Sequence, residues 1–146
     1  MLTITDSLEL ANGLRPLLLQ LNRHLRRELT GLGITAGQAA LLHVIRTHPD
    51  IGVRALAEHE GVSAPAMSGY IDRLEAAGFV ARVRSAEDRR RVGLRVTGDG
   101  VRVLRSARSR RTAWLAQRMR RLSDAERAAV AAALEPLALL LAEDPA

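Results

Sequence analysis

Three consecutive arginines directly after an aspartate are the residues best suited to chemistry in this chain. Arg89 to Arg91 follow Asp88 between two short alternating apolar segments, which predicts a polar hairpin tip. Arginine donates planar, paired hydrogen bonds to phosphate and to guanine. A charge run alone is usually a solvated surface. Here a helical segment, a turn at Gly61 and a second helical segment precede it, and this order favours DNA contact by one helix and one basic loop.

Catalytic and metal-binding patterns are absent from the sequence. No nucleophile with a nearby base, glycine-rich phosphate loop or pair of carboxylates stands at a functional spacing, so we expect no enzyme. The chain has no cysteine, which excludes disulfides and thiolate metal sites. His43 and His48 are five residues apart, and His59 has no second histidine at helical spacing. We therefore expect neither a bound metal nor a cofactor.

Composition predicts a helical protein with a polyanionic partner. The 146 residues fit one domain spanning 1–146, and a chain that is 47% hydrophobic but only 2% aromatic must build an aliphatic core. The net charge is +6 and every basic residue except the histidines is arginine, which favours a polyanion. No apolar run is long enough to span a membrane, and the first residues do not resemble a signal peptide. We expect a cytoplasmic protein with no membrane partner.

Apolar periodicity and capping signals divide the chain into six helices and two strands. Candidate capping boxes stand at Asp6, Thr35 and Ser123, each followed three residues later by Glu or Gln. The leucines of the first helix cover a wider face than one contact needs, which predicts a second surface in contact with it. The expected helices cover about 7–29, 35–47, 53–60, 63–77, 97–121 and 123–141, and the expected strands cover 79–84 and 92–96.

The helix expected at 63–77 has two different faces. Ser63 supplies an N-cap, and Pro65 stands in the first turn, where no backbone donor is lost. One stripe is apolar and should be buried: it consists of Met67, Ile71 and Leu74, with Tyr70 beside them. The opposite stripe carries no large aliphatic or aromatic side chain and should face outward: it consists of Pro65, Ser68, Gly69 and Asp72.

The chain resembles the MarR family of bacterial winged-helix transcriptional regulators (multiple antibiotic resistance regulators). The matching residues are Leu56-Ala57, Val62-Ser63, Met67-Ser68, Asp72 to Glu75, Gly78 to Val80, Asp88 to Arg90, and Val96-Thr97 with Gly100. The resemblance implies a mainly α fold with a small β wing, in which a winged helix-turn-helix lobe at about 35–97 is joined to dimerisation helices at about 7–29 and 98–142. It further implies a homodimer on double-stranded DNA.

The resemblance also implies roles for individual residues. The recognition helix at 63–77 and the wing at 81–95 would contact DNA, with Arg73 on a phosphate or bracing the wing, Arg90 in the minor groove and Asp88 shaping the loop. The expected DNA-binding residues are Arg54, Ser63, Ala64, Pro65, Ser68, Gly69, Arg73, Asp88, Arg89 and Arg90. The expected dimer interface contains Leu10, Leu14, Leu17, Leu21, Leu134, Leu137 and Leu141. His43 and Trp114 are candidates for a small-molecule effector pocket, although Trp114 can equally be ordinary packing.

One departure from the family pattern bears on specificity. Positions 64 and 66 are alanine and position 69 is glycine, and none of these can make paired contacts to a base edge. We expect a sequence-specific, ligand-responsive repressor that binds a pseudo-palindromic operator as a homodimer. The alternatives are a winged helix that compacts DNA without specificity, and a dimeric protein-interaction module that has lost DNA binding.

Overall fold

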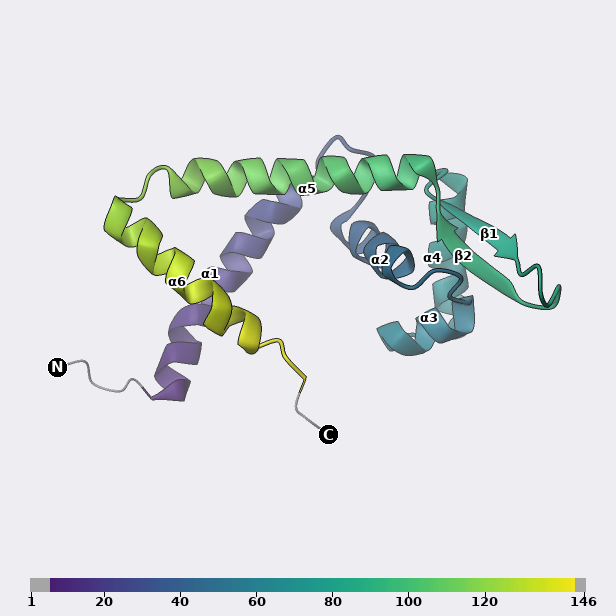
Figure 1. Ribbon diagram of the computed structural model, residues 1–146, viewed down its shortest axis with the longest axis horizontal. Helices are drawn as coiled ribbons and strands as arrows, with labels where there is room; N and C mark the ends of the chain where they lie inside the picture. Colours follow the sequence, from purple (N-terminus) through teal and green to yellow (C-terminus); the bar gives the residue numbers. More distant parts are fainter. Residues whose placement is uncertain (1–5, 144–146) are drawn as a thin grey trace. The chain divides into compact units, whose positions relative to one another are not determined.

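A computed structural model describes residues 6–143 of the chain, and within them it contains six helices and a two-stranded antiparallel sheet (Figure 1). This confirms the expected mainly α fold with a small β wing. The elements are α1 (Ser7–Arg27), α2 (Ala36–Thr47), α3 (Val53–Glu60), α4 (Ala64–Ala76), β1 (Val80–Arg84), β2 (Val92–Val96), α5 (Gly98–Met119) and α6 (Asp124–Leu139).

The chain divides into two compact units, one that ends at Arg111 and one that begins at Thr112, so the boundary falls inside α5. The first unit holds the helix-turn-helix and the two strands. The division into a lobe at 35–97 and dimerisation helices at 7–29 and 98–142 stays a prediction. No helix within residues 6–143 combines the length and apolar composition that a bilayer crossing requires.

An aliphatic core holds the first unit together. Its most deeply buried members come from α2, α3, α4 and the strands: Leu42, Ile45, Leu56, Met67, Ile71, Leu74, Val80 and Leu94. Val103 and Ala107 of α5 join the same core. Burying each such side chain contributes about 1.5–3 kcal/mol. Phe79 packs against this core but is only half-buried, and the buried core members within residues 6–143 are not aromatic, in agreement with the aliphatic core that composition predicts.

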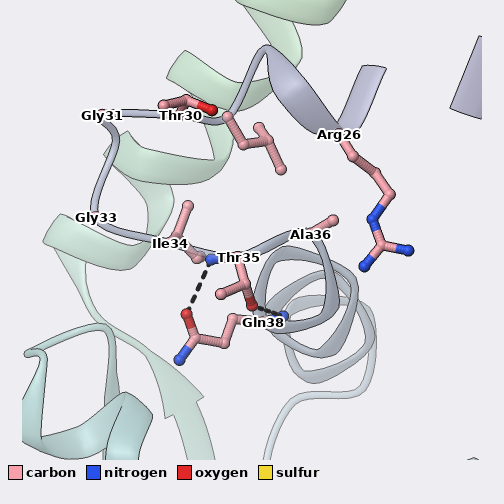
Figure 2. A pocket seen from close by; sticks show the side chains of 9 residues that line it. Arg26, Thr30, Gly31, Gly33, Ile34, Thr35, Ala36 and Gln38 are labelled. Carbon is pink, nitrogen blue, oxygen red and sulfur yellow. Dashed lines mark hydrogen bonds between the residues drawn. The ribbon is translucent and has the colours of Figure 1, made fainter. Parts of the chain in front are cut away.

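Side-chain caps explain where two of the helices begin. Thr35 Oγ1 accepts the N–H of Gln38 at 3.1 Å, and the Gln38 side chain accepts the N–H of Thr35 at 3.0 Å (Figure 2). Ser123 and Glu126 form the same capping box at α6. The capping box expected at Asp6 was wrong: Asp6 precedes α1, but its side chain accepts no capping hydrogen bond. A cap requires a suitable backbone angle at the first residue as well as a suitable side-chain type.

The two strands form a short hairpin, and β1 lies beside α4 (Figure 1). Val80 pairs with Val96 and Arg84 pairs with Val92. The first strand begins at Val80 rather than at the expected Phe79, because Phe79 belongs to the turn that ends α4: its N–H donates to the carbonyl of Leu74 at 3.0 Å. Gly78, with a φ of 84°, provides the left-handed residue of that turn.

The second unit contains the last turns of α5, a tight turn and α6. The Arg127 guanidinium donates to the carbonyls of Met119 at 3.0 Å and Leu122 at 3.1 Å, and to the carboxylate of Asp124 at 2.6 Å. Arg127 therefore donates to carbonyls at the end of α5 and in the turn after it, and links them to the start of α6. The Arg118 guanidinium lies 5.1 Å from the centre of the Trp114 ring.

Candidate nucleic-acid interface

The turn between α3 and α4 sets the position of α4, the candidate recognition helix. Gly61 ends α3 with a φ of 68°, a left-handed conformation that favours glycine. Ser63 Oγ then accepts the N–H of Ala66 at 3.2 Å and caps α4, and Pro65 stands in the first turn. The buried residues of α4 are Met67, Ile71 and Leu74, as the apolar stripe predicts. Their burial turns the opposite face of α4 outward.

That outward face consists of small and polar residues. Ser63 and Pro65 are exposed, whereas Ala64, Ser68 and Gly69 are half-buried. A Cβ built on Gly69 would have no atom within 4 Å. The face is therefore smooth and lacks long side chains with paired donors near its N-terminal end, which is the end that usually contacts base edges.

The sequence suggested that Tyr70 lies beside the buried stripe of α4, but its side chain is not buried with that stripe. It is 40% exposed, and the Arg73 guanidinium lies 5.7 Å from the centre of its ring. Tyr70 is at the edge of the apolar stripe, which avoids the cost of burying a hydroxyl without a hydrogen bond inside the core. Arg73 is exposed beside it.

The contact that braces the wing, residues 80–96, against α4 comes from Arg82 of β1 rather than from Arg73. One guanidinium nitrogen of Arg82 donates to Asp72 and another donates to Glu75, each at 2.8 Å. The hydrogen bond that Arg82 donates to Asp72 raises the pKa of Arg82 above its usual value; burial opposes this effect, and the charge of Glu75 adds to it. Arg82 could not be identified from the sequence, because its partners are seven and ten residues away and these separations match no local pattern.

Hydrogen bonds within the wing tip shape the arginine loop. Asp88 Oδ1 accepts the N–H of Arg90 at 3.0 Å, and the Asp88 carbonyl accepts the N–H of Arg91 at 2.9 Å. Ser85 closes the loop, because its N–H donates to the carbonyl of Arg91 at 2.9 Å. The side chains of Arg89, Arg90 and Arg91 are exposed and make no ion pair with any residue in 6–143. Their charges are therefore available to an anionic partner.

A second contact holds the wing against the loop between α2 and α3. Arg95 donates from Nε and from a terminal nitrogen to the two carboxylate oxygens of Asp50, both at 2.9 Å. The hydrogen bond from Arg95 lowers the pKa of Asp50 below its ordinary value. Asp50 has a φ of 66°, and a Cβ on Gly93 would lie 2.8 Å from the Asp50 Cα. The sequence indicates only a helix-ending turn at Asp50, because Arg95 is forty-five residues away and nothing local connects the two.

Arg54 is exposed near the start of α3, the first helix of the helix-turn-helix. Its side chain is free to reach a backbone phosphate, which is the role expected from the sequence. The structure thus brings α4, the wing tip and Arg54 into one compact unit.

Exposed leucines mark α1 and α6. Leu10, Leu17 and Leu21 of α1 are exposed, as are Leu134 and Leu137 of α6. Leu141, beyond the end of α6, is exposed as well, and Leu14 is half-buried. Neither helix has a buried residue. Apolar surfaces of this kind on a monomer mark sites of association.

A hollow between α2 and the part of α5 in the first unit is strongly cationic. Its volume is about 820 Å³, and its lining residues are Ala39, Ala40, His43, Arg46, Thr47, Leu104, Arg105, Ala107, Arg108 and Arg111. The lining contains four arginines and no carboxylate. His43 is among the lining residues and Trp114 is not; a role for either residue in an effector pocket stays a prediction.

A smaller hollow of about 410 Å³ lies at the connection between α1 and α2 (Figure 2). Gly31 and Gly33 form one rim, and Arg26 is its only charged side chain. The capping box of α2 occupies the polar atoms nearest to it. Within residues 6–143, no group of three or more His, Cys, Asp or Glu residues is placed to hold a metal ion.

Two helices joined by a sharp turn, followed by a basic hairpin that is braced against the second helix, define a winged helix-turn-helix protein. Comparison with known proteins agrees. Residues 34–92 match the model of the MarR family. An HTH-type transcriptional regulator of Mycobacterium bovis is 30% identical over 136 residues, which cover 93% of this chain and 95% of that protein.

The chain belongs to the MarR family of DNA-binding transcriptional regulators, a family of regulators rather than enzymes. Solved structures share the fold. A MarR family protein from Bacillus stearothermophilus is 25% identical, with a TM-score of 0.80, and the match covers 98% of this chain and 100% of that one. A mutant of MepR from S. aureus bound to an oligodeoxyribonucleotide is 20% identical, with a TM-score of 0.71 over 90% of this chain and 97% of that one.

Proposed function

We propose that the chain is a homodimeric, ligand-responsive repressor that binds a pseudo-palindromic operator. The observation that carries the proposal is that ion pairs hold the recognition helix and the wing in one orientation. Arg82 pairs with Asp72 and Glu75. Arg95 pairs with Asp50. A fixed orientation lets α4 enter a major groove while Arg89 and Arg90 reach the flanking minor groove. As a regulator of transcription, the protein would act on chromosomal DNA in the cytoplasm.

Association of two chains is supported by the exposed leucines of α1 and α6. Side chains such as Leu17, which is 58% exposed, and Leu134, which is 64% exposed, would be covered in a dimer. Burial of each contributes about 1.5–3 kcal/mol relative to exposure. Two lobes related by a two-fold axis would contact two half-sites about one helical turn apart.

Base readout by α4 would depend on small contacts. Ser63 and Ser68 can each hydrogen-bond one base or phosphate, and Ala64 can contact a thymine methyl group. Without long paired donors on this face, a larger share of the specificity would come from minor-groove shape, which the wing arginines read. We therefore expect an operator in which A·T-rich flanks matter as much as the half-site bases.

The effector would be an organic anion held between α2 and α5. The supporting observation is the hollow with four arginines, His43 and no carboxylate, since such a lining favours a negative charge. Binding there would change the spacing of the two lobes and so lower operator affinity, because half-site spacing is a strict geometric requirement.

The test is to recover bound genomic DNA with the purified protein and to footprint the enriched sites. A repressor should protect two half-sites and prefer them over random duplex by about a thousandfold or more at physiological salt. Equal affinity for all duplexes would instead favour DNA compaction. No binding at all would favour a protein-interaction module, and either result would overturn the proposal.

A further inference from the structure

Two imidazole rings that the proposed function does not use meet where α2 ends and α3 ends. His48 is the residue at the C-terminus of α2, and His59 is in the last turn of α3. The two ring centres are 5.4 Å apart and the ring planes are inclined by 60°. The sequence separation of eleven residues concealed this pair, because a single helix brings together only residues three or four apart.

The hydrogen bonds of His48 assign its tautomer. Its Nδ1 lies 3.0 Å from the carbonyl of Val44 and 3.1 Å from Thr47 Oγ1. A carbonyl only accepts, and the Thr47 hydroxyl donates its own hydrogen to the same carbonyl at 3.0 Å. Nδ1 of His48 therefore carries the hydrogen, and the lone pair lies on Nε2.

His59 has the same arrangement. Its Nδ1 lies 3.4 Å from a carboxylate oxygen of Glu60, which also accepts only. Both rings thus use Nδ1 for a local acceptor, which places the lone pair on Nε2. Metal-binding histidines almost always donate their second ring nitrogen to a carbonyl or a carboxylate in this way, which fixes the ring and raises its basicity.

The separation of the rings fits one shared ion. A zinc–imidazole bond is about 2.0–2.1 Å long, and with the ring centre about 1.2 Å beyond the nitrogen, two rings on a tetrahedral ion have centres about 5.2 Å apart. The observed 5.4 Å is close to that value. The ends of two helices also meet here, and the C-terminal end of each carries partial negative charge that favours a cation.

We propose that His48 and His59 bind one divalent transition-metal ion through their Nε2 atoms, with water in the remaining positions. Imidazole ligands suit Zn²⁺, Ni²⁺ and Cu²⁺. Because residues 6–143 supply no third His, Cys, Asp or Glu at this place, the site is open and of modest affinity. The bound ion would join α2 to α3 across the loop that carries Asp50, which pairs with the wing.

The experiment titrates the purified, untagged full-length chain with Zn²⁺ and with Ni²⁺ by calorimetry, and records long-range ¹H–¹⁵N spectra of its histidines. We expect one ion per chain, and a shift of the Nε2 signals of both His48 and His59 while their Nδ1 signals keep the protonated form. His48→Gln and His59→Gln should each weaken binding by at least about tenfold. His24→Gln removes an imidazole on α1 and should leave metal binding unchanged.

The proposal is overturned if binding does not saturate below about 100 µM metal, if the double variant H48Q/H59Q binds as tightly as the parent, or if only one of the two rings responds. A stoichiometry of one ion per two chains would also overturn it, since it indicates a bridge between copies. The spectra of the parent protein decide the matter even if a variant fails to fold. Operator binding can succeed or fail independently of this result.

Discussion

The same substitution should have opposite effects on stability at two helical glycines, Gly100 and Gly69. In a helix, alanine is normally favoured over glycine by about 0.8–1 kcal/mol. A Cβ on Gly100 would lie 2.3 Å from the carbonyl oxygen of Phe79 and 2.6 Å from a methyl group of Val96. A Cβ on Gly69 would meet no atom within 4 Å. Gly69→Ala should therefore stabilise the protein, and Gly100→Ala should destabilise it.

The loss of stability expected for Gly100→Ala depends on how little the atoms around Gly100 can move. The Phe79 carbonyl accepts the N–H of Thr97 at 3.0 Å, and the Thr97 hydroxyl both donates to the carbonyl of Gly78 at 2.6 Å and accepts the N–H of Gly100 at 3.0 Å. The methyl group must therefore displace the start of α5 from the end of α4. Overpacking of this kind costs about 1–3 kcal/mol, which exceeds the gain in helix propensity.

Urea unfolding followed by circular dichroism, at one fixed protein concentration, measures both effects. Gly69→Ala should raise the free energy of unfolding by up to about 1 kcal/mol, and Gly100→Ala should lower it by up to about 2 kcal/mol after the propensity gain is subtracted. Equal m-values would show that the denatured states are comparable. A Gly100→Ala protein as stable as the parent would refute the argument from close packing.

Three other predictions concern the wing and the dimer. Arg90→Ala should reduce the magnitude of the slope of log affinity for DNA against log salt concentration by about one unit, because one phosphate contact is lost, whereas Arg90→Lys should keep the slope. Fluorescence anisotropy with labelled duplex over a salt series measures this slope. The hydrogen bond with Arg95 lowers the pKa of Asp50 below 3.8 in the folded protein. The Asp50 carboxylate therefore stabilises the fold fully above pH 3.8, and this stabilisation is lost as the pH falls through the lower folded pKa. In acid unfolding, the stability of Asp50→Asn should depend less on pH over that range. Leu134→Asp should shift the protein from dimer to monomer in sedimentation velocity and weaken operator binding, and an unchanged dimer would place the interface elsewhere.

Local signals in the sequence predicted most of the element boundaries. Gly61 and Gly78 take left-handed conformations where the sequence places turns, and α3 spans the predicted 53–60. Thr35 and Ser123 form their capping boxes because each box involves only four consecutive residues. Such signals require no knowledge of the rest of the fold. The family resemblance added the assembly of these elements into a winged helix-turn-helix fold, which the comparisons confirm.

The contacts that orient the candidate site could not be predicted in the same way. Arg82 finds two carboxylates on α4, and Arg95 finds Asp50 across forty-five residues. His48 and His59 meet only because α2 and α3 end at the same place. In each case the residue type is ordinary, and its role arises from a neighbour that tertiary packing supplies. A single sequence contains no period or spacing that encodes such a pair.

These long-range ties constrain how binding can be regulated. Arg82 joins the wing to α4, and Arg95 joins it to the loop between α2 and α3. A single exposed ion pair contributes little to stability. The wing is nevertheless held at two separate places, and Gly93 packs against the backbone of Asp50 as well. Moving the wing alone would break both pairs and this packing together. Moving a whole lobe would break none of them, so the rigid lobe is the unit that the proposed effector would displace. Variants that lose one of these ion pairs should reduce operator affinity without abolishing a response to such an effector.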